Sequence, residues 1–319
     1  MQKFKWRRIV LKVGSALIAP EQDGCRSRYL LTIAQFIVRC RAQGIEVILV
    51  SSGSVAAGSH LFPKQEKRSV TMKKAMAAAG QTEMMAMWDR FFDFPSAQIL
   101  LTHGDLRDRE RYTSIRETVF TLLEHGVLPI INENDTVTTD DLKVGDNDNL
   151  SAMVAAAADA DALMIFSDVD GLYNKNPNLH EDAVLLPEIE SIDESIYAMA
   201  GCATSAVGTG GMKTKIEAAE KATSHGITTF ILNGFKEETF NRLLEGDNPG
   251  TIFTPYEKPM QEAVHWMTHT ANEQGEVVVE GSIDESTEDG CIRSDEIVAV
   301  HGEFGVGDTI LVRSDDGTR

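Results

Sequence analysis

The chain has 319 residues, with 42% hydrophobic and 25% charged residues, a composition typical of a soluble globular protein. At one domain per roughly 150 residues, this length leaves room for a large domain and a smaller one. The formal net charge is −19, and an acidic surface repels nucleic-acid phosphates and anionic lipid. The expected partner is therefore a small molecule, with no nucleic acid and no membrane.

The N-terminus and the cysteines indicate a cytoplasmic protein. The apolar stretch behind the basic N-terminal residues runs only from Ile9 to Leu11 before Lys12, which is too short for a signal peptide. No run approaches the roughly 20 apolar residues of a membrane span. The four cysteines lie far apart and form no Cys-x-x-Cys pair, so we expect free thiols rather than a disulfide framework or a zinc site.

Over the first 255 residues, short β-branched runs alternate with longer helical patterns, as in βαβ units that build a parallel sheet. Six strands are predicted, at 8–13, 46–51, 97–102, 127–132, 162–167 and 228–233. Helices are predicted between them, at 28–41, 69–92, 113–124, 149–158 and 212–224. The strands are apolar almost throughout, which is typical of strands buried on both faces. The predicted fold class is therefore α/β, with an open, mostly parallel sheet and helices on both faces.

From Tyr256 onward the pattern changes. Pro255 and Pro259 bracket a predicted linker, and VVVEG, EIVAV and DTILVR are predicted to be short strands separated by Gly, Asp and Ser turns. Residues 260–319 hold 14 Asp and Glu residues against three arginines. We therefore predict a large α/β domain over residues 1–255 and a small, strongly acidic, β-rich module over residues 260–319.

The first strand ends in Lys12-Val13-Gly14-Ser15, and ligands of open parallel sheets bind at the carboxyl ends of the strands. A lysine there favours an anionic partner, although an edge lysine that reaches solvent is the alternative. Gly14 lacks the Cβ that would keep a phosphate away from the backbone. Because no Walker A motif is present, a different arrangement for binding phosphate is required.

A glycine-rich segment, Gly208-Thr209-Gly210-Gly211, leads directly into the helix predicted at 212–224. Exposed N–H groups and the positive end of a helix dipole favour a phosphate at such a point. The hydroxyls of the segment and two lysines on the first helical turn, Lys213 and Lys215, agree with this interpretation. A flexible loop with glycines for its turns is the alternative.

Two segments rich in Asp, Asn and Glu form another candidate site. Asn132-Glu133-Asn134-Asp135 follows the fourth strand, and Gly145-Asp146-Asn147-Asp148-Asn149 opens the next predicted helix. One Asx residue is a good helix cap, but four in succession exceed what a cap uses. They could orient cationic side chains, coordinate Mg²⁺ through water or bind the amino group of a substrate. A solvated acidic loop is the alternative for each segment.

Small and hydroxylated residues follow the second strand, in Ser51-Ser52-Gly53-Ser54-Val55-Ala56-Ala57-Gly58. Backbone donors and the Ser52 hydroxyl could hold a carboxylate there. A close crossing of a helix and the sheet would select the same small residues. The fifth strand is followed by Ser167-Asp168-Val169-Asp170-Gly171, again polar at the carboxyl end.

Together, these motifs resemble the glutamate 5-kinases (gamma-glutamyl kinases) of the amino acid kinase superfamily, over roughly residues 8 to 255. The lysine-glycine start and Asp168-Val169-Asp170-Gly171-Leu172-Tyr173 are shared with aspartate, acetylglutamate and uridylate kinases. The Asn-Glu-Asn-Asp and Gly-Asp-Asn-Asp-Asn pair is more specific to glutamate 5-kinases. The resemblance implies that ATP, with Mg²⁺, phosphorylates the γ-carboxylate of L-glutamate in the first step of proline synthesis.

The resemblance also implies roles for individual residues. Lys12 and Lys215 would flank the transferring phosphoryl group, and Asp148 would hold the two lysines. The positions that match the glutamate site are Ser52, Asp135 and Asn147. The positions that match the ATP site are Lys12, Gly14, Ser167, Asp168, Thr209, Gly210, Gly211, Met212, Lys213, Thr214 and Lys215. Gly14 and the turn at Gly210 and Gly211 would supply backbone donors. Which residues bind the metal directly stays open.

Further implications of the resemblance concern regulation and the C-terminus. They are feedback inhibition by proline at or near the glutamate site, and a homo-oligomer, either a dimer or a tetramer. The C-terminal module lies where many members carry a PUA domain, a β-barrel type that binds RNA elsewhere. A Ser-Leu-Leu-Pro-x-Gly-like segment and a closing strand are missing from this sequence. We therefore expect a PUA-like module that is degenerate or truncated and too acidic to bind RNA.

Three other functions remain open. The acceptor could be another amino acid carboxylate, aspartate or N-acetylglutamate, because the sequence does not give the geometry that separates these substrates. The protein could be a non-catalytic amino-acid sensor on the same fold, although a sensor does not need Lys12, Asp148 and Lys215 together. An RNA-binding function through the C-terminal module is opposed by its charge.

Overall fold

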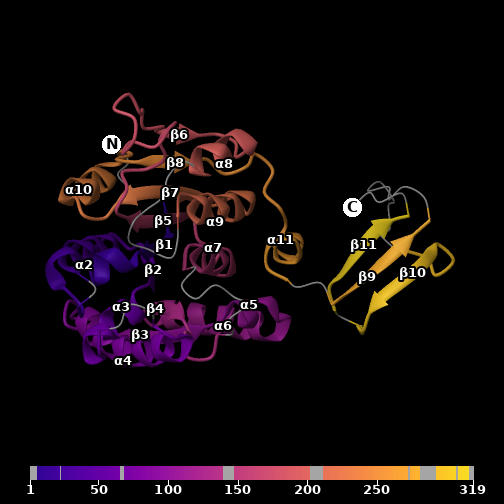
Figure 1. The fold of residues 1–319 in the computed structure, drawn as a ribbon, viewed down its shortest axis with the longest axis horizontal. Coiled ribbons are helices and arrows are strands. Elements are labelled where there is room, and N and C mark those ends of the chain that lie inside the picture. Colours follow the sequence, from indigo (N-terminus) through magenta and orange to yellow (C-terminus); the bar gives the residue numbers. More distant parts are fainter. Residues whose placement is uncertain are drawn as a thin grey trace. The chain divides into compact units, whose positions relative to one another are not determined.

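The computed structural model describes residues 6–21, 23–64, 68–138, 147–201, 211–271, 274–280, 292–306 and 308–315. The chain forms two compact units, Met1–Glu262 and Ala263–Arg319 (Figure 1). Among the described residues, no helix has both the length and the apolar character that crossing a membrane requires.

The first unit is built on an eight-stranded sheet in the order β3-β4-β2-β1-β5-β7-β8-β6. Its strands are β1 (Arg8–Val13), β2 (Glu46–Ser51), β3 (Ser96–Leu101), β4 (Leu128–Glu133), β5 (Ala162–Ser167), β6 (Glu188–Ile189), β7 (Thr228–Asn233) and β8 (Thr251–Phe253). Every neighbouring pair is parallel except β7 and β8. β1 pairs with β2 on one side and with β5 on the other, so the chain order reverses at β1. Such a switch point is where open α/β sheets bind ligands.

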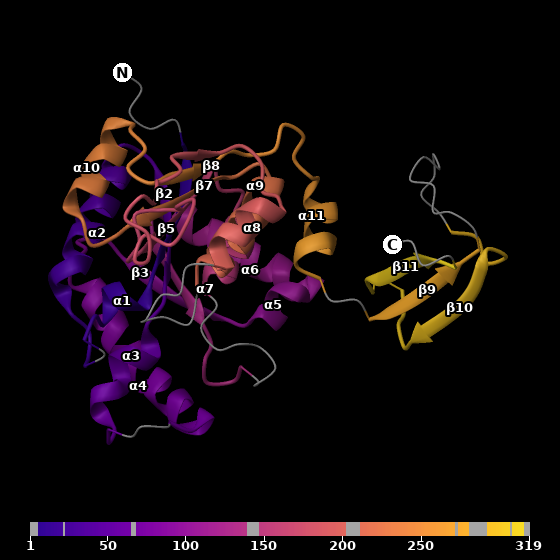
Figure 2. The ribbon, with the colours of Figure 1, turned by 45° about the horizontal axis from the view of Figure 1, so that its top comes forward.

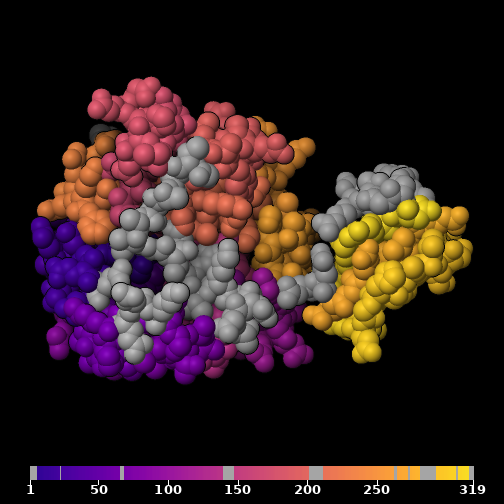
Figure 3. Space-filling view, in the orientation of Figure 1, coloured from indigo at the N-terminus to yellow at the C-terminus, as the bar shows by residue number. Residues whose placement is uncertain are grey.

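Helices cover both faces of this sheet, as predicted. They are α1 (Ser15–Ile18), α2 (Ser27–Ala42), α3 (Ser54–Gly58), α4 (Val70–Asp89), α5 (His103–Arg107), α6 (Arg109–Glu124), α7 (Asn147–Ala157), α8 (Glu194–Gly201), α9 (Met212–Ser224) and α10 (Glu237–Glu245). Figures 1 and 2 show α2 and α10 on one side of the sheet and α7 and α9 on the other. The indigo-to-purple and the pink-to-orange parts of this unit pack into one continuous body (Figure 3).

The two layers follow from the alternation of side chains along β1. Ile9, Leu11 and Val13 belong to the core cluster that also contains Phe36 of α2 and Phe240 of α10. Because successive side chains of a strand point to opposite faces, Val10 and Lys12 face the other side, where α7 contacts β1. Every residue of α7 is buried, so this helix lies inside the protein rather than on its surface.

The α/β prediction is confirmed, with small differences at the element ends. The strands predicted at 8–13, 46–51, 162–167 and 228–233 and the helix predicted at 212–224 have these bounds in the structure. The strand predicted at 97–102 ends one residue earlier, because the Thr102 hydroxyl accepts a hydrogen bond from the Asp105 N–H and caps α5. The strand predicted at 127–132 starts one residue later, because the Val127 N–H donates to the Leu122 carbonyl at the end of α6.

The predicted helices also change at their ends. The helix predicted at 113–124 starts at Arg109, because the carboxylate of Asp108 accepts from the Arg111 N–H at 2.9 Å. The helix predicted at 69–92 ends at Asp89, and Phe91 and Phe92 lie in the turn that follows. The helix predicted at 149–158 spans Asn147–Ala157, and the one at 28–41 gains a residue at each end. The short helices α1, α3, α5, α8 and α10 and the strands β6 and β8 were not predicted.

The second unit contains three strands and is described by itself. α11 (Glu262–His269) begins at its boundary and is followed by β9 (Gly275–Val279), β10 (Ile297–Gly302) and β11 (Ile310–Ser314). The strand order is β10-β9-β11, with β10 antiparallel and β11 parallel to β9. The three strands coincide with the three predicted in VVVEG, EIVAV and DTILVR, apart from their ends, whereas α11 was not predicted.

Two of the cysteines fall within the described residues. Cys25 and Cys40 are buried free thiols, as predicted, and Cys202 and Cys291 lie outside the described residues. Burial raises the pKa of both described thiols to about 12, for Cys25 with a smaller contribution from the Glu83 carboxylate. At neutral pH both are therefore protonated and unreactive.

A backbone contact fixes α4 against the turn that follows β2. A Cβ on Gly80 would lie 1.9 Å from the Ser54 carbonyl oxygen, and one on Gly58 would lie 2.0 Å from the Met76 carbonyl oxygen. Only glycine permits this approach at either position. The contact places α4 beside Ser54.

The replacement Gly80→Ala tests this contact. In an ordinary helix interior it would stabilise by up to about 1 kcal/mol, but here the methyl group meets backbone that cannot move aside. We expect it to lower the free energy of unfolding by about 3 kcal/mol, measured by urea unfolding. Gly104→Ala in α5 is the control, because its Cβ would have only Thr102 Oγ1 nearby, at 3.4 Å. A Gly80→Ala protein as stable as the wild type would show that α3 and α4 can separate freely.

Candidate active site

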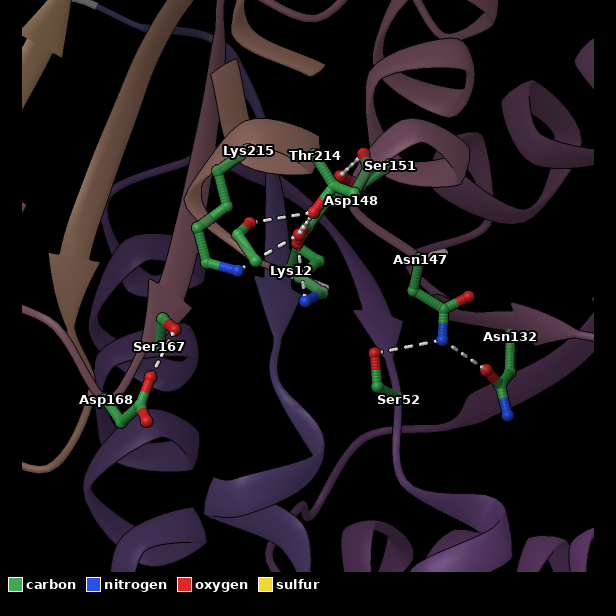
Figure 4. Close-up of polar contacts among 11 residues, drawn as sticks. Lys12, Ser52, Asn132, Asn147, Asp148, Ser151, Ser167, Asp168, Thr214 and Lys215 are labelled. Carbon is green, nitrogen blue, oxygen red and sulfur yellow. Dashed lines mark hydrogen bonds and ion pairs between the residues drawn. The ribbon is translucent and has the colours of Figure 1, made fainter. Parts of the chain in front are cut away.

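Polar side chains from six segments meet at the carboxyl edge of the sheet, around the switch point at β1 (Figure 4). They come from β1, the turn after β2, β4, the first turn of α7, the end of β5 and the first turn of α9. The residues are Lys12, Ser52, Asn132, Asn147, Asp148, Ser167, Thr214 and Lys215.

A carboxylate lies between two ammonium groups at the centre of the site. Lys12 Nζ lies 2.6 Å from Asp148 Oδ1, and Lys215 Nζ lies 3.0 Å from Asp148 Oδ2. The side chains of Lys12, Asp148 and Lys215 are 8%, 1% and 6% exposed. We call these three residues the charge triad. It carries more positive than negative charge and is therefore suited to an anion.

The electrostatic balance keeps Asp148 ionised. Burial by itself would raise the pKa of Asp148, but the ammonium groups of Lys12 and Lys215 outweigh it and hold that pKa below the ordinary range. The Thr214 hydroxyl donates to Asp148 Oδ2 at 2.8 Å. Because this folded-state pKa is lowered, the ion pairs stabilise the fold above the ordinary carboxyl pKa and weaken only as the pH falls through the folded value.

The residues predicted to bind ATP divide into several groups. Thr214 and Lys215 both contact Asp148, and Gly211 caps α9 directly before them. Lys213 turns away, since side chains two positions apart on a helix do not share a face. It is 71% exposed and lies 3.8 Å from Glu217. Met212 is buried in the core, and Thr209 and Gly210 lie outside the described residues.

Gly14 and the end of β5 form the other side of the predicted nucleotide site. The Gly14 N–H donates to the Phe166 carbonyl at 3.1 Å, so in this structure that N–H pairs with the backbone of β5. A Cβ at Gly14 would lie 3.2 Å from that carbonyl, so glycine permits a tight contact between β1 and β5. Directly beyond, the Ser167 hydroxyl donates to Asp168 Oδ1 at 3.0 Å.

The residues predicted to bind the substrate lie on the other side of the charge triad. Asn147 Nδ2 donates to Ser52 Oγ at 2.9 Å and to Asn132 Oδ1 at 3.0 Å. Asp135 Oδ2 accepts from Ser54 Oγ at 2.7 Å. Among the described residues, Asn147 Oδ1 and Asp135 Oδ1 are buried and have no hydrogen-bond partner. Two buried acceptors of this kind suit a ligand that brings hydrogen-bond donors.

The Asx-rich segment at the start of α7 has more than one role. Asp148 orients two lysines, and Asn149 Oδ1 accepts from Lys221 Nζ of α9 at 2.7 Å. Asn149 Nδ2 lies 3.4 Å from Glu217 Oε2, also on α9. The prediction that the segment orients cationic side chains is thus confirmed for Asp148 and Asn149, while Asp146 lies outside the described residues.

Four further residues complete the site, and the motifs gave them no role of their own. Asn132 and Ser54 were part of motifs, so their positions after strands could have identified them. The Ser151 hydroxyl donates to the Asp148 carbonyl at 2.6 Å and holds the first turn of α7. Gln81 of α4 accepts from Asn132 Nδ2 at 2.8 Å, and no feature of the surrounding sequence indicates that contact.

Comparison with known proteins supports the same family and the same fold. The sequence pattern of the amino acid kinase family matches residues 7–233. The chain is similar to glutamate 5-kinase 1 of Pseudoalteromonas translucida, 86% identical over the whole chain and 87% of that protein. It is also similar to the glutamate 5-kinase of Idiomarina loihiensis, 57% identical over the whole chain and 86% of that protein. Among solved structures, the UMP kinase from Bacillus anthracis has a TM-score of 0.54 at 14% identity over 78% of this chain and 96% of that one, a likeness of fold.

Asp135 generates a prediction about stability. Burial raises the pKa of its carboxyl group, the hydrogen bond from Ser54 offsets this in part, and the charge of Glu133 raises the pKa further. A carboxyl group whose folded-state pKa is raised destabilises the fold at neutral pH, because the unfolded chain ionises more readily. We expect Asp135→Asn to raise the midpoint of thermal unfolding by roughly 2–4 °C at pH 7.

The pH dependence is the control for that prediction. Below the ordinary carboxyl pKa, Asp135 is protonated in both states, so the gain should shrink toward zero as the pH approaches about 4. A gain that is independent of pH, or a loss of stability at pH 7, would contradict the assignment. Asp182→Asn, at a 78% exposed side chain paired with Lys175, should shift the midpoint little in either direction.

Proposed function

The chain belongs to the amino acid kinase family and, within it, to the glutamate 5-kinases, and from this premise we propose the reaction and the roles of the site residues. The protein transfers the terminal phosphoryl group of ATP to the γ-carboxylate of L-glutamate. The products are L-glutamyl 5-phosphate and ADP, in the first step of proline synthesis. The observation that carries the proposal is the charge triad, two buried ammonium groups held by one carboxylate at the switch point of the sheet.

The chemistry of this transfer needs what the triad supplies. The acceptor carboxylate is already ionised at neutral pH, so no general base is required. The barrier is lowered mainly by positioning and by neutralising the charge on the phosphoryl oxygens. Lys12 and Lys215 would lie on either side of the transferred group and bind those oxygens. Asp148 is a positioning residue that holds the two ammonium groups in place before the substrates bind.

The acceptor amino acid would bind beside the triad. Its α-ammonium group is a donor with three N–H bonds, and Asp135 Oδ1 and Asn147 Oδ1 are buried acceptors without a partner among the described residues. Ser52 Oγ lies next to Asn147 and would contact the same molecule. A bound ammonium group would also relieve the unfavourable burial of the Asp135 charge.

ATP would bind on the opposite side, along the end of β5 and the start of α9. Ser167, Asp168, Gly211 and Thr214 line this region, and Thr209 and Gly210 are proposed from the family pattern alone. Met212 and Lys213 belong to the same pattern. Met212 would contribute through packing and Lys213 through the long-range attraction of its charge. Gly14 would act by keeping β1 close to β5 rather than by donating a hydrogen bond.

Magnesium is proposed as the accompanying ion. Among the described residues, no group of three or more His, Cys, Asp or Glu side chains is placed to hold a metal. Mg²⁺ commonly keeps several waters and is held by substrate phosphates with one or two carboxylates. An ion that arrives with ATP needs no such group, and Asp168, directly after β5, is a candidate carboxylate. The bound ion would supply additional neutralisation of the phosphate charge.

Regulation, assembly and location are proposed from family membership and chemistry. Proline carries the α-carboxylate and a cationic α-nitrogen, so it can compete for the acceptors that would bind glutamate.

The protein would form a homo-oligomer, a dimer or a tetramer, and act in the cytoplasm, where its thiols stay reduced. Residues 1–255 would form the catalytic domain, and residues 260–319 a PUA-like module. The surplus of acidic residues in that module opposes RNA binding.

The acceptor is tested by trapping the product. The protein is incubated with Mg-ATP, hydroxylamine and either glutamate, aspartate or N-acetylglutamate, because hydroxylamine converts an acyl phosphate into a stable hydroxamate. We expect hydroxamate from glutamate alone, and less of it when millimolar proline is added at low glutamate. Hydroxamate from another acceptor would replace the proposed substrate, and none from any acceptor would favour an amino-acid sensor. Unchanged turnover with proline would remove the proposed inhibition only.

The roles of the two lysines are tested by Lys12→Ala and Lys215→Ala. Each variant removes a charge that would contact the phosphoryl group in the transition state, so we expect kcat to fall by at least about 10³-fold. Lys73→Ala on the exposed face of α4 is the matched control and should keep the wild-type kcat. Thermal unfolding checks that the variants fold. A folded variant with a near wild-type kcat would refute the assigned role.

A further inference from the structure

Gln81 is an amide on the buried side of a helix that otherwise contributes apolar and small residues to the core. The buried residues of α4 are Met76, Ala77, Gly80, Gln81, Met84 and Trp88. Gln81 is 9% exposed, and its Oε1 accepts from Asn132 Nδ2 at 2.8 Å. Its Nε2 is buried and has no hydrogen-bond partner among the described residues.

A buried amide with an unpaired N–H lowers the stability of the fold, so we expect its bond to Asn132 to have a function. A buried donor without a partner destabilises a protein, whereas an apolar side chain of the same size would fill the space without that penalty. Met76 and Met84, on the same helix, show that a long apolar side chain is compatible with this core. Packing therefore does not explain an amide at this position.

A backbone group sets the direction of the hydrogen bonds that begin at Gln81. The Glu133 N–H can only donate, and it donates to Asn132 Oδ1 at 2.9 Å. The Asn132 amide must therefore turn its Nδ2 toward Gln81, whose oxygen accepts. Asn147 must turn its own Nδ2 toward Asn132 Oδ1, at 3.0 Å. Asn147 Oδ1 is then the group that faces away from the network.

The same helix also supports the second buried acceptor. Gly80, next to Gln81, packs directly against the backbone of Ser54, and the Ser54 hydroxyl donates to Asp135. α4 thus lies behind both Asn147 and Asp135, although it contributes no residue that the family pattern assigns to the site.

We infer that Gln81 is a positioning residue for recognition of the α-ammonium group of the acceptor amino acid. Together with the Glu133 N–H, the Gln81 oxygen holds the Asn132 amide at both of its ends, and the Asn132 amide in turn keeps Asn147 Oδ1 available to that group. Without the Gln81 oxygen, Asn132 Nδ2 loses its acceptor, the Asn132 amide is held at its oxygen alone, and Asn147 is positioned less firmly. This inference rests on the proposed function and adds a determinant of selectivity for an amino acid over a plain dicarboxylate.

The test compares glutamate with glutarate, which has the same carbon chain and both carboxylates but no α-ammonium group. The KM for glutamate and the inhibition constant of glutarate against glutamate are measured for the wild type and for Gln81→Met, a near-isosteric apolar variant. We expect Gln81→Met to raise the KM for glutamate by about tenfold, as expected for loss of a hydrogen bond to a charged group. The inhibition constant of glutarate should change by less than about threefold and the KM for ATP by less than about twofold.

Two further variants separate positioning from general damage. Gln81→Glu keeps an acceptor oxygen for Asn132 and should keep the wild-type ratio of the two constants within about threefold. Met76→Leu, one and a half turns earlier on the buried side of α4, controls for disturbance of the helix and should leave both constants unchanged. If Gln81→Met does not fold, Gln81→Asn replaces it, because the shorter amide cannot reach Asn132.

The outcomes distinguish this inference from the proposed function. A Gln81→Met protein in which both constants stay unchanged, or rise together, would overturn the positioning role. A wild-type protein that forms no hydroxamate from glutamate would instead remove the proposed function on which the role depends. A selective loss of glutamate affinity with retained glutarate affinity supports the inference.

Discussion

The site depends on one interaction, the contact of Asp148 with two buried lysines. Two ammonium groups brought close together in a buried position would repel each other and would lose their hydration. A single carboxylate, held by Thr214 and itself buried, makes that arrangement possible. The same contact joins β1, α7 and α9. The ion pairs that concentrate positive charge therefore also connect three parts of the fold. The site can therefore be charged and rigid before any ligand is present.

The position of Asp148 is fixed in turn by the far end of α7. The carbonyl groups of Ala157 and Ala158, at the end of this helix, accept hydrogen bonds from the guanidinium groups of Arg116 and Arg8. Both guanidinium groups lie over the ring of Phe120, at 4.8 and 4.5 Å from its centroid. Cations at a helix C-terminus also complement the helix dipole. The buried helix is thus held at one end by arginines and at the other by the lysines of the site.

Much of this structure follows from local sequence, and the remainder depends on contacts between distant segments. The central strands are predictable because strands buried on both faces are nearly continuous apolar runs. The short α3 is not predictable, because it depends on a left-handed Gly53, at φ 101°, and on the backbone contact with α4. Lys12, Asp148 and Lys215 are found through their motifs. Gln81 is not, because its contact with Asn132 spans 51 residues and depends on which face of α4 is buried.

Successive residues of α7 divide the site into its two halves. Side chains of neighbouring residues on a helix point about 100° apart, so Asn147 and Asp148 face different groups of side chains from a single turn. Figure 4 shows Asn147 directed toward Ser52 and Asn132, and Asp148 directed toward Thr214 and the lysines. One half offers acceptors, which suit an ammonium group, and the other offers cations, which suit phosphate. Since the two side chains belong to one helix, its geometry would set the separation between the amino acid and the phosphoryl group in the proposed reaction. A loop between the two halves would leave that separation variable, and transfer in line between two bound substrates requires it to be constant.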